Sequence, residues 1–182
     1  RDYPHGSFGL CNLITLLRAT VVAALSALVF APGSLMRDPQ LAWTVFTLAA
    51  AVLALDGLDG WAARRSGLVS SFGARFDMEV DIALALLLAI LAWQSGKAGA
   101  CVLALGSLRH VFVAAGWIWP VLRAPLSDAL WRKLACVIQI AALVVLLAPV
   151  VVPPVSQWVA AAALAVLAGS FGRDTVWLLR RR

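Results

Sequence analysis

Long apolar runs dominate the chain, and polar positions are confined to short breaks between them. Each run approaches the ~20 residues that an α-helix needs to cross the hydrocarbon core of a bilayer. The runs are continuous in Ala, Leu and Val, whereas the strands of a membrane barrel alternate apolar and polar residues. The pattern therefore predicts an all-α integral membrane protein with six transmembrane helices. Their approximate bounds are 10–31, 41–62, 76–94, 98–122, 134–152 and 155–179.

The composition agrees with this pattern. The chain has 182 residues, the length of one ordinary domain, and we detect no internal repeat or low-complexity linker. Its hydrophobic content of 63% and mean hydropathy of +0.93 exceed those of a soluble globular protein. We therefore predict a single membrane domain over residues 1–182.

The basic residues predict the orientation. With the amino terminus in the cytosol, ten of the fifteen Lys and Arg residues lie on the cytosolic side and two, Arg37 and Lys97, on the other. This predicts that both termini and the active site face the cytosol, and we expect the membrane to be a bacterial inner membrane. Topology and anionic lipid explain the net charge of +6 better than nucleic acid does, since no nucleic-acid motif is present.

Acidic residues gather where apolar ones are expected. An Asp at the centre of a membrane helix costs about 2.5–3.5 kcal/mol, so clustering is expensive unless it serves a site. The alternative is that these acids cap helices or pair with Arg64, Arg65 and Arg75. Five of the nine acidic residues lie in one 26-residue window: Asp56, Asp59, Asp77, Glu79 and Asp81.

The spacing of four aspartates predicts that they converge. Asp56 and Asp59 are three residues apart, and Asp77 and Asp81 are four apart, so each pair occupies one helix face. Counted from the basic loop between them, the two pairs lie at matching depths, about 6–12 Å below the cytosolic interface. Antiparallel packing of the two helices would bring the four carboxylates together.

Four clustered carboxylates repel one another and need protons or cations. Ligands that are all oxygen select hard ions such as Mg²⁺, Mn²⁺ or Ca²⁺, and a pair of ions about 4 Å apart clamps a transferring phosphoryl group. Gly60, Ala63 and Gly73 leave the helix surface beside the acids bare, and Arg64 is near enough to meet phosphate charge. The site therefore indicates phosphate chemistry.

These residues resemble the signature of the CDP-alcohol phosphotransferase family at every fixed position. The match runs Asp56-Gly-Leu-Asp59-Gly60-Trp-Ala-Ala63-Arg64, then to Gly73, Asp77 and Asp81. The first helix also resembles the family, with the opening Asn12-Leu-Ile-Thr15-Leu-Leu-Arg18.

The resemblance implies a six-helix homodimer that transfers a phosphatidyl-type group from a CDP-activated lipid, such as CDP-diacylglycerol, to an alcohol. It implies two ions of Mg²⁺ or Mn²⁺ held by the four aspartates, with Asp81 also the general base. The residues implied for the nucleotide and diphosphate are Asn12, Thr15, Asp59, Gly60, Ala63, Arg64 and Gly73.

The acceptor is less clearly indicated. The stretch from Arg132 and Lys133 to Gln139 resembles that of phosphatidylglycerol-phosphate synthases, and Arg109 matches a frequent Arg on the fourth helix. These cations could hold an acceptor phosphate, such as that of glycerol 3-phosphate. They could equally set the topology. For Glu79 we expect an ion pair with Arg18 or Arg109, or a place in a dimer interface.

Two other classes use acids in membrane helices. A prenyltransferase binds a prenyl diphosphate through Mg²⁺, and a non-enzymatic cation-binding or transport protein lines an ion path with acids. The prenyltransferase predicts two separated Asp-rich repeats without Ala63, Arg64 and Gly73. Neither class releases CMP.

Overall fold

The computed structural model describes residues 10–66, 71–119 and 130–180, and every regular element in these ranges is a helix. This confirms the all-α prediction. In chain order the elements are α1 (Leu10–Ser26), the 3-10 helix η1 (Ala27–Phe30), α2 (Ser34–Arg37), α3 (Pro39–Ser66), α4 (Ser71–Gln94), α5 (Val102–Ile118), α6 (Leu130–Leu147) and α7 (Val155–Arg180).

The six long helices coincide with the six predicted apolar runs. Within the described residues, three helical segments are long and apolar enough to cross a membrane, which indicates a membrane protein: Asn12–Phe30, Pro39–Leu58 and Val155–Trp177. Shorter apolar stretches occupy α5 and α6, and the 24 residues of α4 include charged residues in its first half. That all six helices cross the membrane stays a prediction.

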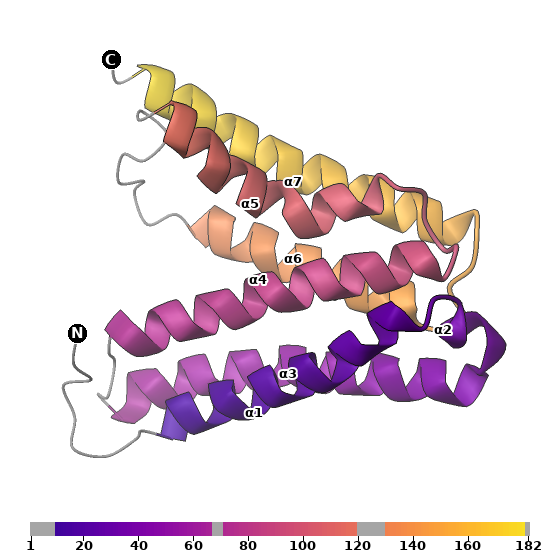
Figure 1. Cartoon of the computed structure of the whole chain (residues 1–182). Coiled ribbons are helices and arrows are strands. Elements are labelled where there is room, and N and C mark those ends of the chain that lie inside the picture. Colours follow the sequence, from indigo (N-terminus) through magenta and orange to yellow (C-terminus); the bar gives the residue numbers. More distant parts are fainter. Residues whose placement is uncertain (1–9, 67–70, 120–129, 181–182) are drawn as a thin grey trace.

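Helix α4 runs through the middle of the bundle (Figure 1). It packs against α1, α5 and α6, while α3 packs against α1 and α6, and α7 covers α5 and α6. The remaining elements, η1 and α2, form the connection between α1 and α3. Consecutive long helices run in opposite directions, so the start of α4 and the end of α3 lie at the same end of the bundle (Figure 1).

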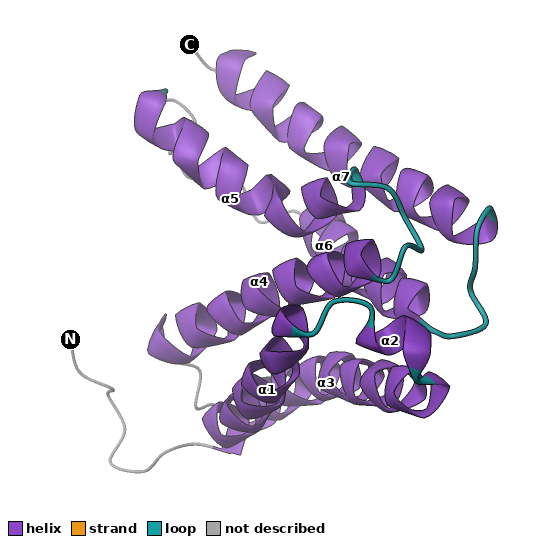
Figure 2. Ribbon diagram, turned by 45° about the vertical axis from the view of Figure 1, so that its right-hand side comes forward, coloured by secondary structure: helices purple, strands orange, loops and turns teal. Residues whose placement is uncertain are grey.

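The apolar core fills one half of the bundle. It includes the fully buried Leu84, Leu88 and Leu91 of α4, together with Leu105 of α5 and Leu143 of α6. In the other half α5 diverges from α4 towards Ile118, as Figures 1 and 2 both show. The tightly packed half holds the helices together, and the diverging half contains the acidic residues of α4.

Helices α4 and α5 meet closely at Gly106. A Cβ atom added there would lie 2.8 Å from the Ala89 Cβ, 2.9 Å from the Ala85 carbonyl oxygen and 2.9 Å from the Leu86 Cα. Two of these three are backbone atoms, which cannot move without shifting α4. Small residues at such a crossing let helix backbones approach in a membrane, where packing supplies much of the association energy.

We predict that Gly106→Ala lowers stability by about 1–3 kcal/mol, because the added methyl group overpacks the crossing. Gly169→Ala is the matched control, since nothing lies within 4 Å of a Cβ at that position of α7. Thermal unfolding of both variants in detergent measures the difference. A Gly106→Ala protein as stable as the Gly169→Ala protein would contradict the close crossing.

Candidate metal centre

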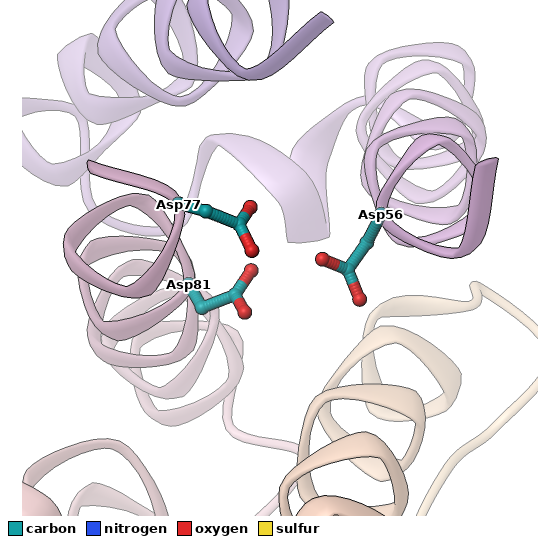
Figure 3. A group of neighbouring side chains, drawn as sticks. All are labelled: Asp56, Asp77 and Asp81. Atoms are coloured by element: carbon teal, nitrogen blue, oxygen red, sulfur yellow. The ribbon is translucent and has the colours of Figure 1, made fainter. Parts of the chain in front are cut away.

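Three aspartates converge from two helices. Asp56 projects from α3, and Asp77 and Asp81 project from successive turns of α4 towards it (Figure 3). One carboxylate oxygen from each residue lies within 4.8 Å of the others. The three side chains are part-buried, with 25% to 34% of their surface exposed. The convergence predicted from the spacing is thus confirmed for these three acids.

Arg18 of α1 occupies the middle of this cluster. Its Nη1 lies 3.0 Å from the Asp56 Oδ1 and donates a hydrogen bond to the Asp77 Oδ1, while its Nη2 donates to the Asp81 Oδ1. The Arg18 side chain is fully buried, with 0% of its surface exposed. One guanidinium therefore bridges three carboxylates from α3 and α4.

The helix lengths place these charges at one depth. Arg18 lies eight residues after the start of α1, and Asp77 and Asp81 lie six and ten residues after the start of α4. Asp56 lies ten residues before the end of α3. At a rise of ~1.5 Å per residue, all four positions are about 9–15 Å from the same end of the bundle.

The donor set suits a hard divalent cation. Carboxylate oxygens are the ligands that Mg²⁺, Mn²⁺ and Ca²⁺ prefer, and each of the three described acids offers one oxygen that lies within 4.8 Å of the other two. With all three acids ionised, their charge of −3 and the +1 of Arg18 sum to −2, which one divalent ion balances. The residues present therefore fit a metal site.

Asn12 and Thr15 lie on the same face of α1 as Arg18, at intervals of three residues. Both are buried, with 1% and 3% of their surface exposed. Within the described part of the chain, the Asn12 Nδ2 has no hydrogen-bond partner. Because buried polar groups are normally hydrogen-bonded, this amide is a candidate donor to a ligand.

Gly73 belongs to the first turn of α4 and flanks the acids. Six other predicted site residues lie where only the helix backbone is described. The side-chain roles predicted for the others stay predictions, because those side chains are outside the described part of the structure. They are Asp59, Gly60, Ala63 and Arg64 near the end of α3, and Arg132 and Lys133 in the first turn of α6.

Arg109 lies beside a different face of α4. Its Nη2 contacts the Met78 Sδ, and it lines a groove of about 360 Å³ with Glu79, His110 and Trp117. Asp77 and Asp81 point instead towards Asp56 (Figure 3). The contacts that the structure describes thus place Arg109 outside the carboxylate cluster.

The ion pair expected for Glu79, with Arg18 or Arg109, is absent among the described residues, and the alternative of a place in a dimer interface stays a prediction. The guanidinium of Arg18 is engaged by three aspartates, and among the described residues no ion pair involves Glu79. Glu79 instead lines the groove beside Arg109 and a second, apolar groove of about 370 Å³ between α1 and α4. The physical reason is the helix rotation, which turns Glu79 away from the face that carries Asp77 and Asp81.

Gln139 has a structural role. It is buried in α6, and its Nε2 donates a hydrogen bond to the Leu105 carbonyl oxygen of α5. Its similarity to a residue of the phosphatidylglycerol-phosphate synthases is therefore explained by packing and carries no separate argument for an acceptor.

Arg18 is the site residue whose contacts the sequence reasoning missed. A signal for it was present: Arg18 is the one charge in an otherwise apolar helical run and shares a face with Asn12 and Thr15. A cation buried in a membrane helix needs an anionic partner, and a cluster of acids at equal depth is the natural one.

Comparison with known proteins adds an independent finding to this geometry. A family model described as CDP-alcohol phosphatidyltransferase matches residues 8–169. No curated protein and no solved structure matches the chain. The matched range contains all four charged residues of the cluster and most of the helices that position them. The chain therefore belongs to the CDP-alcohol phosphatidyltransferase family, whose enzymes transfer a phosphatidyl group from a CDP-alcohol to an acceptor.

Proposed function

We propose that this protein is an enzyme of phospholipid biosynthesis that uses CDP-diacylglycerol as its donor and releases CMP. The observation that carries the proposal is the convergence of Asp56, Asp77 and Asp81 inside the range that matches the family. Family membership also argues against a prenyltransferase and against a transport protein. Glycerol 3-phosphate is the acceptor that we propose first.

The family generally depends on a divalent metal, and the acid cluster could hold one. We assign Mg²⁺ or Mn²⁺, as two ions, to Asp56, Asp59, Asp77 and Asp81. When bound, the ion would neutralise the negative charge of the diphosphate and the charge that develops on the leaving phosphate oxygen. The oxygen-only donor set of the three described acids supports this assignment.

The transfer itself needs one bond made and one broken. The acceptor hydroxyl oxygen attacks the phosphorus that carries the diacylglycerol, and the bond from this phosphorus to the bridging diphosphate oxygen breaks. CMP leaves with that oxygen, and the hydroxyl proton passes to a base. We assign the base role to Asp81, which lies one turn further along α4 than Asp77 and is part-buried.

The nucleotide and diphosphate are assigned to the surface beside the acids. Arg64 would pair with phosphate, and Gly60, Ala63 and Gly73 would let the diphosphate approach the helix backbones. Asn12 and Thr15 would contact the nucleotide from α1. The buried Asn12 amide nitrogen that lacks a partner among the described residues supports this.

The acceptor cations of the proposal are Arg132 and Lys133, whereas the contacts of Arg109 lie on another face of α4 and leave it outside the proposed pocket. A phosphate monoester carries up to two negative charges that the aspartates repel, so it needs cations of this kind. Helix α6 packs against both α3 and α4, which supports a role for its first turn.

We also propose the membrane setting of the enzyme. All six long helices would cross a bacterial inner membrane, with the active site and both termini on the cytosolic side. The alternating directions of the helices and the bias of basic residues support this orientation (Figure 1). We further propose that the enzyme is a homodimer.

Binding of Mg²⁺ to the proposed site should be measurable as an increase in protein stability. Mg²⁺ at a hundred times its dissociation constant should stabilise the wild-type protein by about 2.7 kcal/mol, because the ion binds the folded state. Asp77→Asn should remove most of this effect. Asp38→Asn is the matched control, since Asp38 caps α3 at the opposite end of the bundle, where it accepts hydrogen bonds from the Gln40 and Leu41 backbone. Thermal unfolding with Mg²⁺ and with a chelator measures the effect; equal stabilisation of Asp77→Asn and wild type would contradict the site.

The second prediction concerns turnover. Asp56→Asn and Asp77→Asn should each lower kcat at least about a hundredfold, because a misplaced ligand removes charge stabilisation of the transition state. CMP release from CDP-diacylglycerol, followed with a panel of alcohols, measures this, with Asp38→Asn as the control. A lack of CMP release by the wild-type protein with every acceptor would refute the proposed function.

The third prediction concerns the acceptor. Arg132→Ala and Lys133→Ala should raise the KM for glycerol 3-phosphate and leave the KM for the CDP-lipid unchanged, because uniform binding of the acceptor phosphate is lost. Acceptor kinetics of the two variants provide the measurement. If both behave as wild type, the two cations set topology and bind anionic lipid instead.

A further inference from the structure

We propose that Arg18 is the internal counter-cation of the metal centre: it holds Asp56, Asp77 and Asp81 together while no metal is bound, and it competes with the divalent cation for their oxygens. The inference rests on the proposed metal site. It assigns to a residue of α1 a role in setting metal affinity.

The fold brings the negative charges of three carboxylates together around Arg18. Three carboxylates whose oxygens lie within 4.8 Å of one another repel strongly in a medium of low dielectric. Arg18 cannot relieve this by losing its own proton, because a guanidinium stays charged in proteins. Its buried positive charge is therefore a permanent part of the cluster and keeps the acids together when they are ionised.

The guanidinium of Arg18 contacts one oxygen of each carboxylate. Its Nη1 contacts the Oδ1 atoms of both Asp56 and Asp77, and its Nη2 contacts the Oδ1 of Asp81. A Mg²⁺ or Mn²⁺ ion shared by these residues would draw on the same carboxylates. Ion and guanidinium carry the same sign of charge, so each weakens the attraction of the carboxylates for the other.

The consequence is a metal affinity lower than the one that the three aspartates would have without Arg18. Without Arg18, the three acids would present a charge of −3 to the ion; with Arg18 they present −2. The empty site stays assembled, because the guanidinium links α1 to the two helices that carry the ligands. A purely structural arginine would affect stability equally with and without metal, so the two roles can be separated by experiment.

The test uses purified, chelator-treated protein in detergent and Mn²⁺ as the probe. Free Mn²⁺ is counted by electron paramagnetic resonance during titration, and thermal unfolding is followed without metal and with saturating Mn²⁺. The variants are Arg18→Gln, which removes the charge, and Arg18→Lys, which keeps the charge but replaces the bridging fork with a single ammonium. Arg37→Gln is the matched control, because it removes the same charge from exposed α2.

Arg18→Gln should bind Mn²⁺ about tenfold or more tightly than wild type, because a neighbouring positive charge has been removed. Its melting temperature without metal should fall, and saturating Mn²⁺ should close most of the gap to wild type. Arg18→Lys should lose stability without metal and bind Mn²⁺ about three- to tenfold more tightly than wild type, because its single ammonium group contacts fewer of the carboxylate oxygens. Saturating Mn²⁺ should therefore narrow its stability gap to wild type. Arg37→Gln should change neither quantity.

Unchanged or weaker Mn²⁺ binding by Arg18→Gln, or a stability gap that Mn²⁺ does not narrow, would overturn the inference. If Arg18→Gln does not fold, Arg18→Lys decides: tighter Mn²⁺ binding with a stability gap that Mn²⁺ narrows supports competition, and an unchanged affinity with an unchanged gap refutes it. Wild-type binding with an unchanged affinity in Arg18→Gln refutes this inference alone. An absence of Mn²⁺ binding in every variant refutes the proposed metal site as well.

Discussion

The contact of one buried guanidinium with three carboxylates constrains the arrangement of α1, α3 and α4. Charged side chains inside membrane helices are tolerated when they pair with one another within the bundle. The fold meets this requirement by placing Arg18, Asp56, Asp77 and Asp81 at one depth. The same contact explains why a helix that carries no acid still belongs to the site, because removing α1 would leave three part-buried acids without their cation.

The bundle separates packing from chemistry along its length. Leu84, Leu88 and Leu91 bury α4 in the apolar half, and the approach at Gly106 fixes α5 against it. Beyond this crossing the two helices diverge towards the end that carries the acids (Figure 2). Acidic side chains on helices that a close-packed half holds in place suit a reaction in which positioning and charge stabilisation dominate.

The sequence predicted the helices well because long apolar runs and helical spacing are local signals. The meeting of Asp56 with Asp77 and Asp81 followed from their spacing across one antiparallel connection. For Arg18 the sequence indicated only the need for an anionic partner at equal depth. Which acids it contacts depends on how α1 is rotated against α3 and α4, and helical spacing alone does not give this rotation. The same limit applies to Glu79, whose expected ion pair is absent among the described residues. The four-residue helix α2 was missed because it has no periodic signal of its own.

We propose that α6 carries the residues that select the acceptor. Arg109 is turned towards Met78 and Glu79, on a face of α4 away from Asp77 and Asp81. Gln139 is committed to the contact with α5. Helix α6, in contrast, packs against both helices that carry the acids, and its first turn begins at the end of the bundle where those acids lie (Figure 1). Under the proposed function, a phosphate held by the cations of that first turn would bring the hydroxyl group of the acceptor towards the carboxylates. We therefore propose that the charge of this turn separates a phosphorylated acceptor from a neutral one.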